Sequence, residues 1–548
     1  MISLGILVML ASCTIEGVAL LPGPGTLAGD TDDGDDGEES YGDVGESFGM
    51  DSGAMLDFAG GGEAMEAACV LGPNSIDAAM PCSRPEVSSE FAPQLGWSWA
   101  GVGDEDSVLV TPLVANLDDD NGDGFVDLCD VPDVVVVVVA LSGQKGQPVP
   151  AGHVAVLDGR SGSLRLISTQ PVDAGVTPAL ADLDGDGRPE IITIAHEGPM
   201  APNQIYQRRL VALDADGQLL WTGDTWTTSN GGGAVAVADL DGDGSPEILG
   251  PELVADAEGH MLWFPASPPL GGSAPVAVDL DQDGDLEVLY GSSAYDHHGQ
   301  SLFEGLPGKK NSGVVAVANF DDDPLPEIYV QAGTHRILEH DGSPAVQCAT
   351  SGSNPAAVVD VDGDGKGELL FSSKNHFELM TVVDGSCQSL FDLDVDEADG
   401  MSSGTAFDLL ADGSPELIHA DRSRLRIYDA QGQVLFQANR TARSNRSYPV
   451  VVDVDNDGAA EILVVSSRAL DNDGSLSQGP TPAVMLFENA DDAFAPTRRI
   501  WNQHAYLGAN IAEDASVPET MAGDWRSFRT NVAPSGPSNL CQGSDPVE

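Results

Sequence analysis

Short apolar stretches separated by turn-forming residues fill the chain from about residue 91 onwards. Residues 274–303 are typical: APVAVDL, LEVLYG, SAYD and QSLFEG are four strand-like runs, and an acidic loop separates the first two. Apolar residues at helical spacing are nearly absent. Four short strands in about 40 residues, repeated along the chain, are typical of a β-propeller blade. We therefore predict an all-β fold, a β-propeller, in preference to a parallel β-helix with its much shorter repeats.

The acidic loop recurs eight times. Its copies are ANLDDDNGDGFVDLCDVPDVV (115–135), ADLDGDGRPEI (181–191), VADLDGDGSPEI (237–248), VDLDQDGDLEV (278–288), ANFDDDPLPEI (318–328), VDVDGDGKGEL (359–369), FDLLADGSPEL (407–417) and VDVDNDGAAEI (452–462). Eight loops predict eight four-stranded blades, with seven as the alternative if one loop belongs to an incomplete blade. FAPQLGWSW (91–99) is a strand-like run without a blade of its own, and we predict that it closes the ring against the last blade.

The order Asp-x-Asp-x-Asp-Gly-x-x-Glu gives the loop its chemistry. Carboxylates at positions 1, 3 and 5 can turn inward around one point, the glycine permits the sharp turn, and the carboxylate at position 9 helps to complete an oxygen shell. Such a set of hard ligands suits Ca²⁺ better than Mg²⁺, which demands stricter octahedral geometry. We predict several bound Ca²⁺ ions that stabilise the folded blades. The predicted ligands in the five intact loops are Asp182, Asp184, Asp186 and Glu190; Asp239, Asp241, Asp243 and Glu247; Asp279, Asp281, Asp283 and Glu287; Asp360, Asp362, Asp364 and Glu368; and Asp453, Asp455, Asp457 and Glu461.

The other three loops depart from this pattern. The first has twelve-residue EF-type spacing in a β context, with predicted ligands Asp119, Asn121, Asp123, Asp127 and Asp130. The fifth carries Asn319 first and Pro324 in the place of glycine, so we expect weaker binding. The seventh has Leu410 at position 3, so we expect it to be empty or nearly so.

The strand–DxDxDGxxE–strand unit resembles the FG-GAP/VCBS repeats of integrin α-subunit-type propellers, over about residues 105–470. The resemblance implies calcium loops on one face that rigidify the blades, with ligands bound elsewhere. RRIWNQHAYLGANIAED (498–514) resembles a tail that follows such repeats in bacterial surface proteins. Its Trp501, His504 and Tyr506 suit either a sugar-binding site or a packed cap over the last blade.

The N-terminus predicts export. Residues 1–12 are almost wholly apolar and precede Cys13, which resembles a bacterial lipoprotein signal with Cys13 as the lipidated residue; a chance cysteine is the alternative. We predict a disordered acidic tether over 13–66, a lead-in with the closing strand over 67–104, the propeller over 105–500 and a C-terminal cap or tail over 501–548. Cys348 and Cys387 lie 39 residues apart, close to the repeat length, so we expect them at similar places on neighbouring repeats.

The charge balance limits the partners. With 88 acidic and 23 basic residues the formal net charge is −65, which argues against nucleic acid and anionic membrane surfaces as partners. No G-x-S-x-G, phosphate-binding glycine loop or H-E-x-x-H is present, and we predict no catalytic residue. We expect a monomeric binding or adhesion module for an extracellular protein or polysaccharide, in the bacterial envelope as an outer-membrane lipoprotein or secreted. The alternatives are a carbohydrate-active enzyme, such as a calcium-dependent polysaccharide lyase, and a structural envelope protein.

Overall fold

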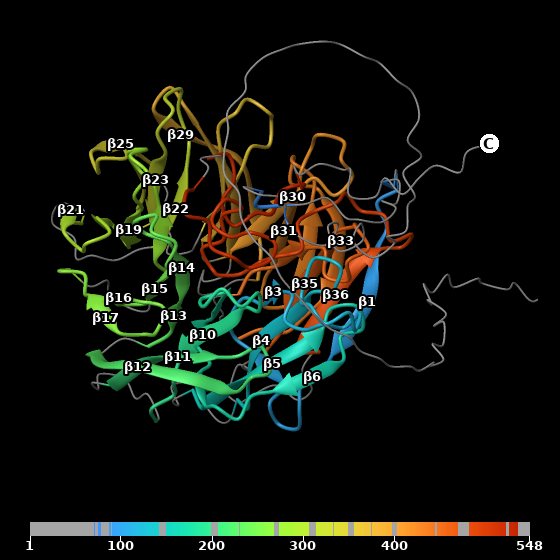
Figure 1. Cartoon of the computed structure of the whole chain (residues 1–548). Coiled ribbons are helices and arrows are strands. Elements are labelled where there is room, and N and C mark those ends of the chain that lie inside the picture. Colours follow the sequence, from blue (N-terminus) through green and yellow to red (C-terminus); the bar gives the residue numbers. More distant parts are fainter. Residues whose placement is uncertain are drawn as a thin grey trace, which may run out of the picture. The chain divides into compact units, whose positions relative to one another are not determined.

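The strands come in groups of four, and each group is one antiparallel blade (Figure 1). The computed structural model describes residues 71, 75–77, 87–88, 90–141, 149–198, 206–228, 231–267, 273–305, 314–331, 334–348, 356–373, 375–396, 403–443, 447–469, 482–521 and 525–534. All of them belong to the compact unit Gly60–Glu548. The predicted signal peptide, Cys13 and the tether lie outside these residues. The described part of the chain contains no helix, and hence none that could span a membrane.

Eight blades follow one another in sequence order. From the innermost strand outwards they are β3 (Leu113–Ala115), β4 (Asp133–Val139), β5 (Ala151–Asp158) and β6 (Leu164–Ile167); β9 (Ala179–Ala181), β10 (Glu190–Ile194), β11 (Tyr206–Leu213) and β12 (Leu219–Thr228); β14 (Ala236–Ala238), β15 (Glu247–Gly250), β16 (Leu253–Ala255) and β17 (Met261–Trp263); β18 (Val276–Val278), β19 (Glu287–Tyr290), β20 (Ser293–Tyr295) and β21 (Ser301–Phe303); β22 (Val314–Ala318), β23 (Glu327–Gln331), β24 (His335–Leu338) and β25 (Pro344–Gln347); β26 (Ala356–Val359), β27 (Glu368–Ser373), β28 (His376–Val383) and β29 (Ser386–Asp394); β30 (Gly404–Phe407), β31 (Glu416–Ala420), β32 (Arg424–Tyr428) and β33 (Val434–Asn439); and β34 (Val450–Val452), β35 (Glu461–Val465), β36 (Val484–Asn489) and β1 (Pro93–Trp99). Blade one also carries β2 (Ser107–Val108) and β7 (Val172–Asp173), and β8 (Val176–Thr177) pairs in parallel with β13 (Gly233–Ala234). The eight-bladed propeller predicted from the sequence is therefore confirmed, and the seven-bladed alternative is wrong.

The ring closes through the N-terminal strand. In Figure 1 the blue β1 lies beside the orange β36, and the two pair antiparallel from Pro93 opposite Asn489 to Trp99 opposite Val484. Blade eight therefore takes its outermost strand from residues 93–99 and its other three strands from the far end of the repeat region. The predicted closing role of the 91–99 run is confirmed.

Small side chains occupy the innermost strands, which read LVA, ALA, AVA and VAV in blades one to four. All of these residues are buried, because inner strands converge where space is limited. The outermost strands instead expose apolar residues such as Leu220, Leu262 and Leu302. The hydrophobic core therefore lies between the blades and towards the axis.

An aromatic side chain on the outermost strand of one blade packs over a glycine in the outer hairpin of the next. Trp221 of β12 lies against Gly259, and Trp263 of β17 lies against Gly299. The ring of Trp263 also donates an N–H hydrogen bond to the carbonyl of His297, at 3.0 Å. The same contact recurs as Trp97 with Gly162, Phe303 with Gly342 and Phe391 with Gly432. Each of these glycines has a positive φ, which favours glycine, and at all of them except Gly432 a Cβ would collide with the ring.

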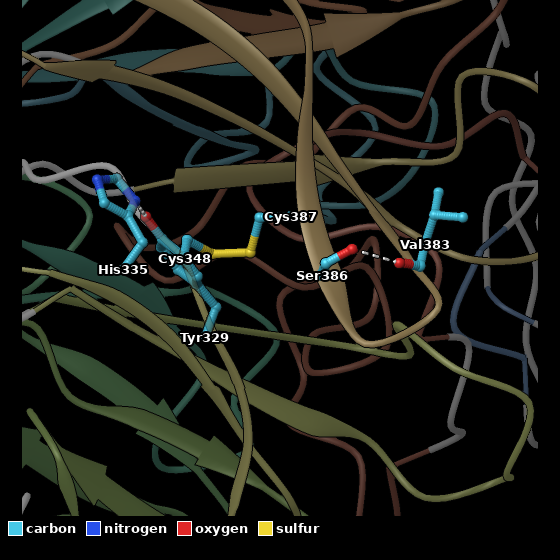
Figure 2. The surroundings of a disulfide bond; sticks show 6 residues. All are labelled: Tyr329, His335, Cys348, Val383, Ser386 and Cys387. Carbon is cyan, nitrogen blue, oxygen red and sulfur yellow. Dashed lines mark hydrogen bonds between the residues drawn. A yellow bond between two sulfur atoms is a disulfide. The ribbon is translucent and has the colours of Figure 1, made fainter.

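A disulfide takes the place of this aromatic contact between blades five and six (Figure 2). In blade three, Trp263 pairs with Val254 of the neighbouring strand. The corresponding pair in blade five is Val346 with Ile337, so blade five has valine in the place of the aromatic residue. Gly385 in the next hairpin has no neighbour within 4 Å of a Cβ position. Instead, Cys348, just after β25, is bonded to Cys387 in β29, with 5.3 Å between their Cα atoms. The two cysteines lie on neighbouring blades as expected, but not at similar places, because Cys348 follows the end of β25 whereas Cys387 is near the start of β29. Cys129 is also disulfide-bonded.

The C-terminal segment, residues 495–534, lies against the inner strands of the blades; its red trace runs among them in Figure 1. Trp501 forms an isolated antiparallel bridge with Val114 of β3, and Phe528 forms another with Val358 of β26. Further hydrogen bonds join this segment to β9, β14, β30 and β34. Trp525 and Leu507 share a core cluster with β18 residues of blade four. Contacts with so many inner strands place the segment on the axis of the ring, and we call it the central plug.

Removing the disulfide should loosen the interface between blades five and six. We expect Cys348→Ser/Cys387→Ser to lower the melting temperature, because no aromatic contact supports this interface. Adding Val346→Trp should recover part of the loss. Differential scanning calorimetry measures both changes, and variants are preferable to a reductant because Cys129 is disulfide-bonded too. An unchanged melting temperature in the double serine variant would show that the disulfide is dispensable.

Buried arginines should anchor the central plug. Arg529 is fully buried, donates to the carbonyls of Ala356 (2.7 Å) and His504 (3.2 Å), and stacks on Phe528. Arg529→Met would remove both buried, charge-assisted hydrogen bonds, so we expect a loss of about 2–4 kcal/mol in the free energy of unfolding. Arg526→Met is the control. Arg526 also lies in the plug, but it is exposed, so its substitution should change stability little. Denaturant melts compare the two; equal effects would contradict an anchoring role.

Candidate metal centres

The acidic loop joins the innermost strand of each blade to the next strand, and blade two shows its geometry. Asp182 follows β9 and accepts hydrogen bonds from three backbone N–H groups, those of Gly185, Asp186 and Gly187. Glu190 begins β10, and its Oε2 accepts from the N–H of Leu183 at 2.9 Å. One oxygen each from Asp182, Asp184 and Glu190 lies within 4.8 Å of the others. The fold therefore gathers the first, third and ninth positions as the sequence predicted.

The same closing hydrogen bond recurs in blades two to eight. In each, the N–H at position 2 donates to Oε2 of the glutamate at position 9, over 2.7–2.9 Å. The acceptors are Glu190, Glu247, Glu287, Glu327, Glu368, Glu416 and Glu461. This bond holds one carboxylate oxygen of each glutamate, and in blade six the hydroxyl of Thr381 donates to the other, Oε1 of Glu368, at 3.0 Å. Carboxylate clusters of this kind are shown for the loops of blades two, three, four and five.

Two loop positions adopt left-handed backbone, and sequence reasoning identified only one of them. Position 6 is the expected glycine, such as Gly187 with φ of 84°. Position 4 is also left-handed, as Gly185 in blade two but as Gln282, Ala411 and Asn456 in other blades. Non-glycine residues rarely adopt this conformation, so the loop holds strain that its internal hydrogen bonds must offset. The recurring Asp-Gly-Asp-Gly order was the available signal for position 4.

The loop carboxylates crowd one another. Burial, reinforced by repulsion from the neighbouring aspartates, raises the pKa of Glu190, Glu247 and Glu287 to about 7. The same causes raise the pKa of Glu327 to about 8. In blade eight, burial raises the pKa of Asp453 and of Glu461 well above their usual range. Oε1 of Glu327 and Oε1 of Glu461 are buried without a hydrogen-bond partner. A cation bound by these oxygens would relieve both the repulsion and the missing partner.

The two imperfect loops fold in different ways. In blade seven, Asp408 accepts from the N–H groups of Asp412 and Gly413 although Leu410 supplies no ligand. In blade five, Pro324 has no N–H, and the side chain of Asn319 donates instead to the carbonyl of Asp323. Even so, Asp321, Asp323 and Glu327 keep oxygens within 4.8 Å of one another. The weaker binding expected for blade five and the near-empty site expected for blade seven stay predictions.

The loop of blade one contains a complete turn of its own. Asp119 accepts from the N–H groups of Gly122, Asp123 and Gly124, the pattern that Asp182 makes in blade two. Asp130 accepts from the N–H groups of Asp120, Asn121 and Asp127, so its two oxygens close this turn. Burial raises the pKa of Asp130 to about 6. The predicted EF-like ligand set is thus drawn together around one turn.

The C-terminal candidates Trp501, His504 and Tyr506 lie in the central plug, and all three are buried. Trp501 stacks on Tyr506 with ring centroids 4.3 Å apart, and both lie in the largest core cluster. The hydroxyl of Tyr448 donates to the carbonyl of His504. A ligand could reach these side chains only if the plug moved. Nothing in the residue pattern of this segment predicted that it would contact so many blades.

Known structures share this fold. The V. cholerae biofilm matrix protein Bap1 is 21% identical over 81% of this chain and 99% of its own, with a TM-score of 0.64. The exotype rhamnogalacturonan lyase YesX is 14% identical, with 75% of each chain covered and a TM-score of 0.46. BamB from Moraxella catarrhalis is 13% identical over 69% of this chain and 99% of its own, with a TM-score of 0.40. The likeness to Bap1 shows the fold alone, and the other two carry no functional argument. No protein-family model and no curated protein matches the chain.

Proposed function

We propose that this protein is a calcium-stabilised propeller of the FG-GAP/VCBS type that acts outside the cell as a binding or adhesion module. The observation that carries the metal assignment is the repeated cluster of inward-facing carboxylates, with buried oxygens of Glu327 and Glu461 that lack a partner. Hydrogen-bonded acidic turns at the surface would not need buried, unpartnered oxygens.

The chemistry of the ligands favours calcium. Every side-chain ligand in the loops of blades two, three and four is a carboxylate, and three or four of them converge on one point. Hard oxygen donors in a flexible loop suit Ca²⁺, whereas Mg²⁺ keeps more of its water and demands stricter geometry. Several Ca²⁺ ions would also offset part of the net charge of −65.

An extracellular location fits both the metal and the fold. Outside the cell Ca²⁺ is abundant enough for the weak sites typical of extracellular modules. Bap1, which shares the fold, is named as a biofilm matrix protein. We propose that Cys13 carries a lipid anchor in the bacterial envelope and that residues 13–66 act as a tether between this anchor and the propeller.

The ligand of this module is proposed to be an extracellular protein or polysaccharide. Because the central plug occupies the axis, recognition falls to the surfaces away from it. A polysaccharide lyase would need a basic residue and an acid/base pair in an open cleft. Three arginines of the plug, Arg498, Arg499 and Arg529, are buried and engaged with backbone carbonyls, and the fourth, Arg526, is exposed.

Calcium removal tests the metal assignment. We expect a chelator to lower the melting temperature and added Ca²⁺ to restore it, since the ion binds the folded state only. Asp239→Asn should bind one Ca²⁺ fewer than the wild type, as measured by equilibrium dialysis and atomic absorption. Asp216→Asn, at an exposed hairpin position, is the control and should bind the full number. A melting temperature that ignores both chelator and Ca²⁺ would refute the assignment.

Binding assays test the adhesion role. We expect the calcium-loaded protein to bind a subset of glycans or surface proteins on arrays, and to leave uronate polymers uncleaved. Release of unsaturated products, detected by absorbance at the wavelength of their new double bond, would favour the lyase alternative. Binding to nothing on glycan and protein arrays, with no cleavage, would favour a structural envelope protein.

A further inference from the structure

Blade one differs from its neighbours at the position where the other loops gather their carboxylates. Asp133 pairs with Ala115 across the two inner strands of blade one, just as Glu190 pairs with Ala181 in blade two. Its Oδ2 accepts from the N–H of Leu117 at 3.2 Å, as Glu190 accepts from Leu183. Asp133 is therefore the counterpart of the closing glutamate of the other blades.

The counterpart of position 3 in blade one is Asp118, because it lies three residues beyond Ala115 as Asp184 lies three residues beyond Ala181. The guanidinium of Arg165, from β6 of the same blade, pairs with both carboxylates. Its Nε lies 2.9 Å from Oδ2 of Asp118, and its Nη1 donates to Oδ2 of Asp133. One positive charge thus bridges the two carboxylates that correspond to cation ligands elsewhere in the ring.

Among the residues that the structure describes, no similar pair occurs in the loops of blades two to seven. Among the ion pairs of the described residues, no Lys or Arg meets a carboxylate at position 1, 3, 5 or 9 of these loops. Lys366 and Arg188 contact Asp322 and Asp216 instead, and neither aspartate occupies one of those positions. Arg165 is therefore a feature of blade one.

We infer that Arg165 replaces the metal ion at the inner position of blade one, an inference that rests on the calcium function proposed above. The Asp133 side chain is only 3% exposed, and a carboxylate so buried needs a counter-charge. The insertion in this loop carries its own turn, from Asp119 to Asp130, further from the strands. The carboxylates of that turn are directed to its own centre and do not join Asp118 and Asp133. The guanidinium of Arg165 neutralises these two aspartates instead. The bond from Nη2 of Arg165 to the carbonyl of Ala215, at 3.2 Å, adds a link to blade two.

The sequence contains a matching signal. Leu166 pairs with Val156 in blade one, and Trp221 pairs with Ala212 in blade two. Leu166 and Trp221 are therefore equivalent, and the residues before them, Arg165 and Leu220, are equivalent too. The corresponding residues are Leu262 in blade three and Leu302 in blade four. An arginine where blades two to four have leucine is explained by the two carboxylates that it meets.

Calcium counting tests this inference. Glu190→Gln should lower the number of bound Ca²⁺ ions by one, whereas its counterpart Asp133→Asn should leave the number unchanged. Both substitutions keep the oxygen that accepts the backbone N–H, so the loops can still close. A loss of one Ca²⁺ in Asp133→Asn would overturn the inference while leaving the proposed calcium function intact. A wild type without bound Ca²⁺ would overturn the proposed function itself.

Melting temperatures supply the second readout. Arg165→Met should melt at a lower temperature than the wild type in chelator, and Arg165→Lys should recover much of the loss because it restores the charge. Adding Asp133→Asn to Arg165→Met should also recover part of it, since one unpaired carboxylate is removed. Arg424→Met, which removes an arginine of blade seven that bonds the exposed side chain of Gln437, is the control and should melt like the wild type. Equal melting temperatures for the two methionine variants would overturn the inference, even if the wild type binds Ca²⁺.

Discussion

Hydrogen bonding at the inner edges of the blades is the constraint on which the rest of the structure depends. The innermost strand of every blade has one edge that faces the axis of the ring, where no further strand of the blade can pair with it. Backbone groups that are buried there without a hydrogen-bond partner are costly. The central plug supplies partners through Trp501 and Val114 on one side of the ring and Phe528 and Val358 on another. Arg529 of the plug then bonds the carbonyl of Ala356 in the inner strand β26. The small residues of the inner strands follow from the same arrangement, since they leave room for the plug.

Repetition of the blade allows single positions to vary as long as their physical task is met. Between blades the task is to hold neighbouring outer strands together, and a tryptophan on glycine or the Cys348–Cys387 disulfide performs it. In the loops the task is to neutralise converging carboxylates, for which we propose a cation in most blades and Arg165 in blade one. Different residues in different blades therefore meet the same physical requirement, either contact between neighbouring blades or neutralisation of the loop carboxylates.

Much of the fold could be predicted from the sequence because each repeat of the sequence corresponds to one blade. Strand number, blade number and the closing role of residues 91–99 follow from the spacing of apolar runs and acidic loops, and the structure has all three. The carboxylate clusters follow from local spacing, because each loop is short and closes on itself. Contacts between distant segments carry no such periodicity. The pairing of Trp501 with Val114, or of Arg165 with Asp118 and Asp133, depends on how blades and plug meet in space.

Closure of the ring has a consequence for how the chain acquires its structure. Strand β1 is synthesised before every blade, yet its partner β36, which ends at Asn489, follows seven complete blades in the chain. Every earlier blade therefore joins an open arc with two bare ends, and long-range pairing of this kind is slow. The arc can become a ring only after synthesis has passed Asn489, where β36 ends. Blade eight is therefore incomplete until all the other blades have been made, so closure of the ring is a late step in folding.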